Sequence, residues 1–246
     1  MGPRLTARFC GVSVLLGWLA IAVMPMTALA DGLAVDKVYH PYVQPLEREV
    51  ELRSLYLNDG DEEIDGAQVH RLGLGAALND RLFAEFYLIG EKESRGSSFK
   101  LEAYEAELKW QLTEQGEYAA DWGLLFELET ERDDNVWEYS TAVLVAKEFG
   151  RWTGTLNLAA VYEWGSDVSN EWESKLAAQV RYRYARAFEP ALELYSGDSD
   201  KGFGPVALGD LRMGRGNKLH WEAGLIFGLD SDSPDQTVRA LIEYEF

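Results

Sequence analysis

The feature that most constrains this chain is an alternation of apolar and polar residues that recurs in segments of about ten residues from Glu47 onward. The last segment shows it clearly. One set of its alternate positions holds Val238, Ala240, Ile242, Tyr244 and Phe246, and the other holds Thr237, Arg239, Leu241, Glu243 and Glu245. A period of two puts these sets on opposite faces of a β-strand, whereas the 3.6-residue period of a helix would mix them. We therefore expect strands with one apolar face each.

Twelve such segments follow one another, separated by turn signals. They cover residues 47–57, 67–78, 82–91, 100–112, 118–130, 136–149, 151–164, 171–185, 187–196, 205–213, 218–229 and 237–246. A single-chain bacterial membrane barrel has an even number of antiparallel strands, and its lipid-facing residues alternate with lumen-facing ones. We predict an all-β fold, a closed antiparallel transmembrane β-barrel of about twelve strands in a meander over 47–246. Segment 205–213 has the least sorted faces, and Pro190 and Pro205 favour strand starts.

The connections between segments predict how the barrel is oriented. Those after even-numbered segments are mostly short, such as Asn79–Asp80 and Gly214–Asn217. Those after odd-numbered segments are longer or more polar, such as Asn58–Gly66 and Asp230–Gln236. Short periplasmic turns and longer external loops give this pattern. We therefore expect the N- and C-termini on the periplasmic side.

The tryptophans favour a membrane barrel over a soluble β-sandwich. All those after residue 30 fall near strand ends on the apolar face: Trp110, Trp122, Trp137, Trp152, Trp164, Trp172 and Trp221. Trp152 and Trp164 share one strand and one face, and their spacing corresponds to roughly 30 Å along a barrel axis. Two aromatic girdles at the borders of a lipid layer have about this separation. A sandwich gives no reason for tryptophan at both ends of long strands.

The N-terminal residues 1–30 have the pattern of a secretory signal peptide. Arg4 and Arg8 precede an apolar run, and a small-residue cleavage site ends at Ala30. The run is too short for a stable membrane span. We expect cleavage near Ala30 and localisation in the bacterial outer membrane. The signal holds two of the 23 basic residues and none of the 42 acidic ones, so its loss changes the net charge from −19 to −21. Such acidity excludes a nucleic-acid partner.

The closing residues resemble a known assembly signal. The aromatic Tyr244 and the terminal Phe246 look like the C-terminal signal that the barrel-assembly machinery recognises in Gram-negative outer-membrane β-barrel proteins. The resemblance implies that machinery, outer-membrane lipid and lipopolysaccharide as partners. In size and strand number the chain is similar to small twelve-stranded channels such as the oligogalacturonate-specific porins. Those have a basic lumen for acidic sugars, so their substrate is not expected here.

Charged residues dominate the predicted inward face. An acidic wall is expected from Glu85, Glu105, Glu107, Asp121, Glu127, Glu129, Glu138 and Glu148. Basic patches are expected opposite it, from Arg53, Arg71, Lys175, Arg181, Arg183 and Arg239. This pattern favours a porin-like channel for passive or selective passage of small polar or cationic solutes, without a cofactor. The alternative is a lumen filled by salt bridges, in a non-conducting barrel that serves as a binding or assembly partner in an envelope complex.

Three further features leave alternatives open. Segment 31–46 is rich in aromatic residues and proline, and it could plug the lumen, engage a periplasmic partner or lead plainly into the first strand. Asp59, Asp61, Glu63 and Asp65 in the first loop are weak candidates for a metal site, and the alternative is that acidic loop tips serve solubility. An outer-leaflet lipid-modifying enzyme would need a histidine base near the outer rim. His70 is placed there but on the lipid-facing side, and no Ser–His or Asp–His pair is evident, so we predict no catalytic residues.

Overall fold

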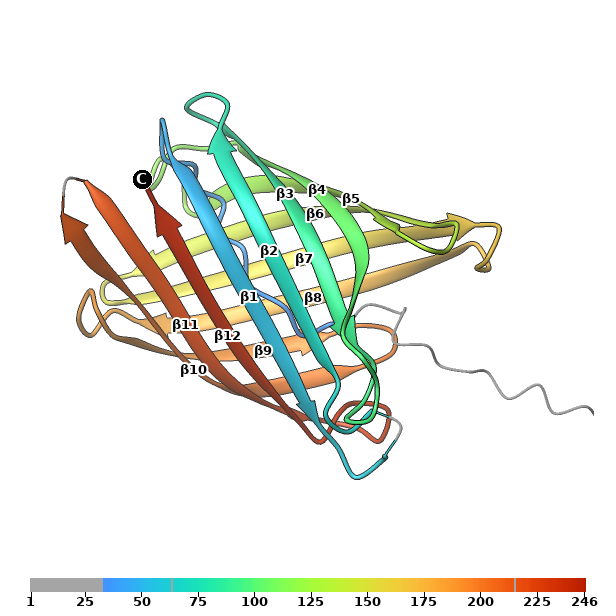
Figure 1. Cartoon of the computed structure of the whole chain (residues 1–246). Coiled ribbons are helices and arrows are strands. Elements are labelled where there is room, and N and C mark those ends of the chain that lie inside the picture. The colour runs from blue at the N-terminus through green and yellow to red at the C-terminus, as the bar shows by residue number, and fades with distance from the viewer. Residues whose placement is uncertain (1–32, 63, 215) are drawn as a thin grey trace, which may run out of the picture.

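The computed structural model describes residues 33–62, 64–214 and 216–246, and every regular element in them is a β-strand (Figure 1). The expected signal peptide and Glu63 lie outside the described residues. The strands are β1 (Arg48–Asn58), β2 (Gln68–Ala77), β3 (Leu82–Lys92), β4 (Lys100–Gln111), β5 (Asp121–Glu131), β6 (Val136–Phe149), β7 (Trp152–Gly165), β8 (Glu171–Tyr182), β9 (Glu189–Ser196), β10 (Lys201–Gly214), β11 (Asn217–Gly228) and β12 (Gln236–Glu245). The described residues form no helix long and apolar enough to cross a membrane.

The twelve strands form a closed antiparallel barrel. Each strand pairs with its neighbours in sequence, and β1 pairs with β12 to close the ring. That seam runs from the pair Glu49–Glu245 to the pair Asn58–Gln236. Closure leaves no strand edge unpaired, which removes the usual route to edge-to-edge aggregation. The predicted meander barrel of twelve strands is therefore confirmed.

Strand limits differ from the prediction by three residues or more at three places, one of which is the end of β8, at Tyr182 rather than at residue 185. β5 begins at Asp121 rather than at residue 118, and β10 begins at Lys201 rather than at residue 205. Pro205 therefore lies inside β10 and not at its start. The pairing of β10 with β11 skips Gly204 and Pro205, as suits a residue that has no N–H to donate. The run of glycine and proline resembled a loop in the sequence, yet it is built into the barrel wall.

The barrel has two rims, which we name by their connections. The turn rim carries the connections after β2, β4, β6, β8 and β10, and the loop rim carries the others. The turn-rim connections, expected to be mostly short, are not uniformly shorter than the loop-rim connections. Residues 112–120 at the turn rim form a connection as long as that of residues 59–67 at the loop rim. Phe246 lies at the turn rim, where its N–H donates to the Arg48 carbonyl at 2.9 Å.

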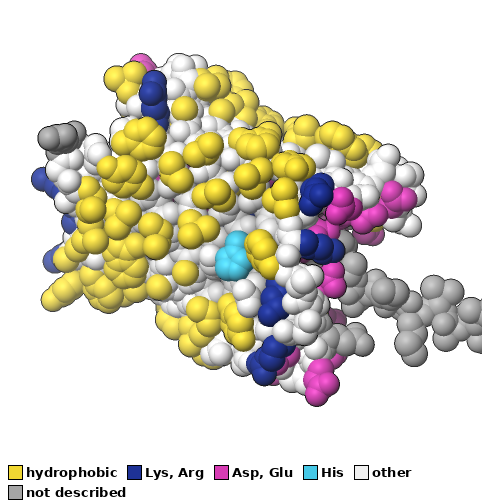
Figure 2. Space-filling view, in the orientation of Figure 1, with side chains coloured by type: hydrophobic (Ala, Val, Ile, Leu, Met, Phe, Trp, Pro, Cys, Tyr) yellow, Lys and Arg dark blue, Asp and Glu magenta, His cyan; other side chains and the backbone are white. Residues whose placement is uncertain are grey.

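The exterior of the barrel is largely apolar. Leu74, Val180 and Ile242 point outward and are each more than half exposed. Figure 2 shows hydrophobic side chains over much of the wall, with charged side chains gathered toward the loop rim at the right of the view. Exposed apolar surface on this scale is costly in water and suits a surface that contacts lipid.

The tryptophans among the described residues all lie on the outward face, in two groups. Trp110, Trp122, Trp152 and Trp221 lie toward the turn rim, and Trp137, Trp164 and Trp172 lie at the loop rim. Across neighbouring strands, the Trp137 and Trp164 rings stack with centroids 6.4 Å apart. The Trp152 ring packs on the Tyr182 ring of the neighbouring strand, with ring centroids 4.8 Å apart. Two aromatic girdles, which this distribution would form at the borders of a lipid layer, stay a prediction.

Candidate functional site: an occupied lumen

Residues 33–46, which we call the lumen segment, run through the barrel from the loop rim to the turn rim. At the loop rim, the Ala34 N–H donates to the Asp200 carboxylate at 2.8 Å. Midway, the Asn157 side chain accepts from the Tyr39 N–H and donates to the Tyr39 carbonyl, both at 2.8 Å. Near the turn rim, the Val43 N–H donates to the Gln111 amide oxygen at 2.7 Å. The thin blue trace that leads into β1 in Figure 1 follows this course.

This course matches one of the three alternatives for segment 31–46, a place inside the lumen, and not that of a separate periplasmic segment. It differs from the expectation that both termini lie on the periplasmic side. Leu33, the first described residue, is at the opposite rim from Phe246, so the described chain does not have both ends on one side. The physical reason is the set of hydrogen bonds that holds the segment along the lumen. Burial raises the pKa of the Asp200 carboxyl at its loop-rim end, and the Ala34 N–H opposes that rise.

Apolar side chains fix one face of the lumen segment to the wall. Ala34, Val35 and Val38 are buried against inward-facing residues of β1, β9, β10 and β11, among them Leu55, Leu57, Ala191, Tyr195, Val206, Leu208 and Ile226. In an empty pore these wall residues would face water. The contact also explains why segment 205–213 had poorly sorted faces, because β10 is apolar toward the lumen segment as well as toward the exterior. The segment and this part of the wall therefore form one core.

The buried arginines are each placed between carboxylates. Arg239 is fully buried, with Nη2 2.9 Å from Glu193 Oε1 and Nη1 2.6 Å from Glu222 Oε2. Arg53 lies 2.9 Å from Glu51 and also binds Asp36 of the lumen segment. A guanidinium has five N–H donors in a planar fork, which suits contact with two acidic groups at once.

The other predicted lumen residues also lie on the inward side or at its ends. Arg71 binds Glu105 and lies 3.6 Å from Glu129. Lys175 is 3.8 Å from Glu138, and Arg181 is 3.3 Å from Glu189. Glu85 accepts a hydrogen bond from the Tyr87 hydroxyl at 2.6 Å, and Asp121 accepts one from the Tyr42 hydroxyl at 2.8 Å. Glu148 forms an ion pair at 2.9 Å with Arg183, which lies in the connection after β8.

An acidic wall opposite basic patches is not what the structure shows. Sequence reasoning missed Glu51 on β1, Glu193 on β9 and Glu222 on β11, which extend the acidic surface around the ring. Their alternation with Arg53 and Tyr195 was the signal that could have found them. Lys37, on the lumen segment, was also missed; its Nζ is 2.8 Å from Glu51. Among the described residues, ten acidic and only two basic residues are buried, so the lumen keeps an excess of carboxylates.

A cavity of about 130 Å³ remains between the lumen segment and the wall from β4 to β8. Its charged lining comprises Asp36, Lys37, Arg71, Glu105, Glu127, Glu129, Glu138 and Lys175. Apolar residues, including Leu125 and Leu144, complete it. With the segment in place, this polar space is small compared with an open channel.

The carboxylates of the first loop hold two connections together. Asp59 accepts from the Asp61 N–H at 2.7 Å and from the Asp235 N–H at 2.9 Å. Asp65 pairs with Arg95 at 2.9 Å. The groups of three possible metal ligands found among the described residues do not include these loop residues. The weak metal site predicted here therefore gains no support from its described members.

A Ser–His pair, not evident in the sequence, occurs on the outward face. Ser54 on β1 lies opposite His70 on β2, and Ser54 Oγ is 2.9 Å from His70 Nδ1. The second ring nitrogen is 3.3 Å from the Gln68 side-chain oxygen. The expectation that His70 faces outward agrees with its strand parity, but the expectation that no serine pairs with it was wrong. Registration of β1 against β2 brings the two together, and sequence alternation alone does not determine that registration.

No family model matches this sequence, and no curated protein matches it. Solved structures show the fold. An outer-membrane channel from Pseudomonas putida F1 has a TM-score of 0.56 and 15% identity, covering 86% of this chain and 98% of that one. The KdgM porin, solved in complex with disordered oligogalacturonate, has a TM-score of 0.52 and 10% identity over 80% of this chain and 98% of its own. The NanC porin has a TM-score of 0.50 and 12% identity over the same shares.

Proposed function

We propose that the protein is a bacterial outer-membrane channel for small cationic or polar solutes, and that the lumen segment restricts its path. The observation that carries this proposal is the excess of buried carboxylates on the inward face of a closed barrel. A low-dielectric wall lined by one sign of charge concentrates ions of the opposite sign. The apolar exterior and the likeness in fold to outer-membrane channels support the membrane setting.

Conductance in planar lipid bilayers tests the proposal. We expect the refolded protein to conduct with a permeability that favours K⁺ over Cl⁻, because carboxylates outnumber basic groups in the lumen. Replacing KCl by a salt with a bulky cation should reduce the current more than replacing chloride by a bulky anion. An anion preference, or an inserted and folded barrel without any conductance, would contradict this function.

A lipid-cleaving enzyme is a second candidate, and the Ser54–His70 contact favours it. A serine hydroxyl becomes a nucleophile when an adjacent imidazole accepts its proton. The pair faces the side from which lipid would approach. Gln68 rather than a carboxylate contacts the second ring nitrogen, so the imidazolium would lack a charged partner.

Hydrolysis of a fluorescent phospholipid in mixed micelles decides whether this pair is catalytic. If Ser54 is the nucleophile, Ser54→Ala abolishes the activity and Gln68→Ala reduces it. A Ser174→Ala variant serves as the control, because that hydroxyl contacts Asp198 at 3.0 Å and no histidine. Equal rates in the wild type and Ser54→Ala would leave the pair with only a role in mutual hydrogen bonding.

A further inference from the structure

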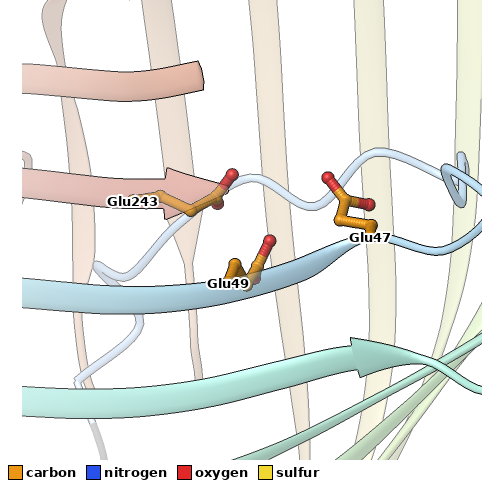
Figure 3. A group of neighbouring side chains, drawn as sticks. All are labelled: Glu47, Glu49 and Glu243. Carbon is orange, nitrogen blue, oxygen red and sulfur yellow. The ribbon is translucent and has the colours of Figure 1, made fainter. Parts of the chain in front are cut away.

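Three groups of inward carboxylates are close enough to share a cation. In each, one oxygen from each of three residues lies within 4.8 Å of the others; the groups are Glu47–Glu49–Glu243, Glu49–Glu51–Glu85 and Glu105–Glu107–Glu127. Figure 3 shows the first group at the turn rim, where Glu47 and Glu243 are partly exposed. In the second group, Lys37 and Arg53 already bind Glu51. Water can therefore solvate the carboxylates of the first group, and basic side chains compensate the charge of the second.

The third group lies deep in the lumen and is the least compensated. Glu107 on β4 is directly opposite Glu127 on β5, and Glu105, two residues before Glu107, lies on the same face of β4. Like charges directly opposite each other on neighbouring strands are destabilising. Arg71 pairs with this group through Glu105, and it is shared with Glu129, which lies 3.6 Å from it. Three carboxylates and one guanidinium leave a formal charge of about −2, which one divalent cation would balance.

The oxygens of this group provide the second, independent observation. Glu105 and Glu107 are each only 4% exposed, and Glu105 Oε1 and Glu107 Oε2 are buried without a hydrogen-bond partner. The other Glu107 oxygen accepts from the Tyr39 hydroxyl at 2.6 Å, and Glu127 accepts from the Ser140 hydroxyl. Neutral hydroxyls satisfy single lone pairs but supply no charge. Buried carboxylate oxygens without a partner are costly unless a cation or a proton occupies the space between them.

We propose that Glu105, Glu107 and Glu127 bind one divalent cation of the calcium type inside the lumen. Calcium takes oxygen ligands at about 2.3–2.6 Å, so oxygens on one ion lie up to about 5 Å apart, which accommodates the separations within this group. Glu105 and Glu127 also line the cavity, which gives room for water ligands. The site goes beyond solute passage, because it needs no conduction. Through Tyr39 and Glu107 the ion stabilises the contact between the lumen segment and the wall.

Calorimetric titration of CaCl₂ into the refolded mature protein, in excess KCl, tests this site. We expect a saturable site whose affinity falls about tenfold or more in Glu107→Gln, which keeps the side-chain shape and removes one charged ligand. Glu243→Gln is the matched control, because it alters the rim group of Figure 3, and its affinity should equal that of the wild type. Absence of saturable binding to the wild type, or equal binding by Glu107→Gln, would overturn the proposal.

A second measurement covers the case in which Glu107→Gln does not fold, as judged by heat-dependent mobility in gels. Tb³⁺ added to the wild type should give luminescence sensitised by nearby Tyr39, and CaCl₂ should displace it while KCl does not. Glu127→Gln should lower the sensitised signal. Absence of sensitised emission, or emission that CaCl₂ fails to displace, would show that these carboxylates hold no calcium-type ion and would overturn the proposal.

Discussion

Arg239 is the residue whose loss should damage the lumen most. Replacing it with alanine leaves Glu193 and Glu222 buried without their cation, which should cost about 3–5 kcal/mol of unfolding free energy. Arg183→Ala is the control, since its pair with Glu148 is about one third exposed on both sides and should contribute about 0–1 kcal/mol. Urea unfolding in detergent, followed by tryptophan fluorescence, measures both. Equal stability of the two variants would contradict the burial argument.

At the residue level, the sequence predicts which side of the barrel wall a side chain points to. It does not predict which residue that side chain contacts. Strand parity correctly placed Arg239 in the lumen, because alternate residues of a strand point to opposite faces. Its partner Glu193 is 46 residues away and three strands around the barrel. Such a contact depends on strand registration and barrel curvature, which are set by many weak interactions together. The Ser54–His70 pair was missed for the same reason.

The lumen segment should act as the restricting element of the pathway. Asn157→Leu removes both hydrogen bonds to the Tyr39 backbone and should increase the open-channel current by loosening the segment. Deleting residues 33–46 should increase it further, because the cavity would then extend across the lumen. Single-channel recordings in planar bilayers compare these variants with the wild type, and Asn170→Leu, at the loop rim, serves as the control. Unchanged conductance in the deletion variant would exclude a restricting role.

Strands were predictable from the sequence to within a few residues, whereas the path of the lumen segment was not. A strand that faces lipid on one side and charged groups on the other has a clear two-residue alternation of apolar and polar residues in its sequence. The lumen segment has no such period, because it is held by single hydrogen bonds and by apolar contacts from scattered strands. β10 shows the intermediate case. Its inward Val206 and Leu208 contact the lumen segment, so its alternation is weak although it is a complete strand.

For the molecule as a whole, closure of the barrel determines how its many carboxylates are distributed. The net charge of −19 would oppose a compact state if the carboxylates were brought together without partners. The barrel distributes them around a ring and places Arg53, Arg71 and Arg239 between them. The composition alone indicated a cation-favouring surface. That this acidity extends around the whole ring became visible only once the strands were arranged in space.

The course of the lumen segment constrains the order in which the molecule can assemble. The segment enters at the loop rim, whereas β1, which follows it, starts at the turn rim. If the ring closed first, the segment would have to be threaded end-on through a lumen that leaves little free volume around it. If the seam between β1 and β12 closes last, Arg53 can bind Asp36 while the sheet is still open. We therefore expect the lumen segment to take its place before the seam between β1 and β12 closes.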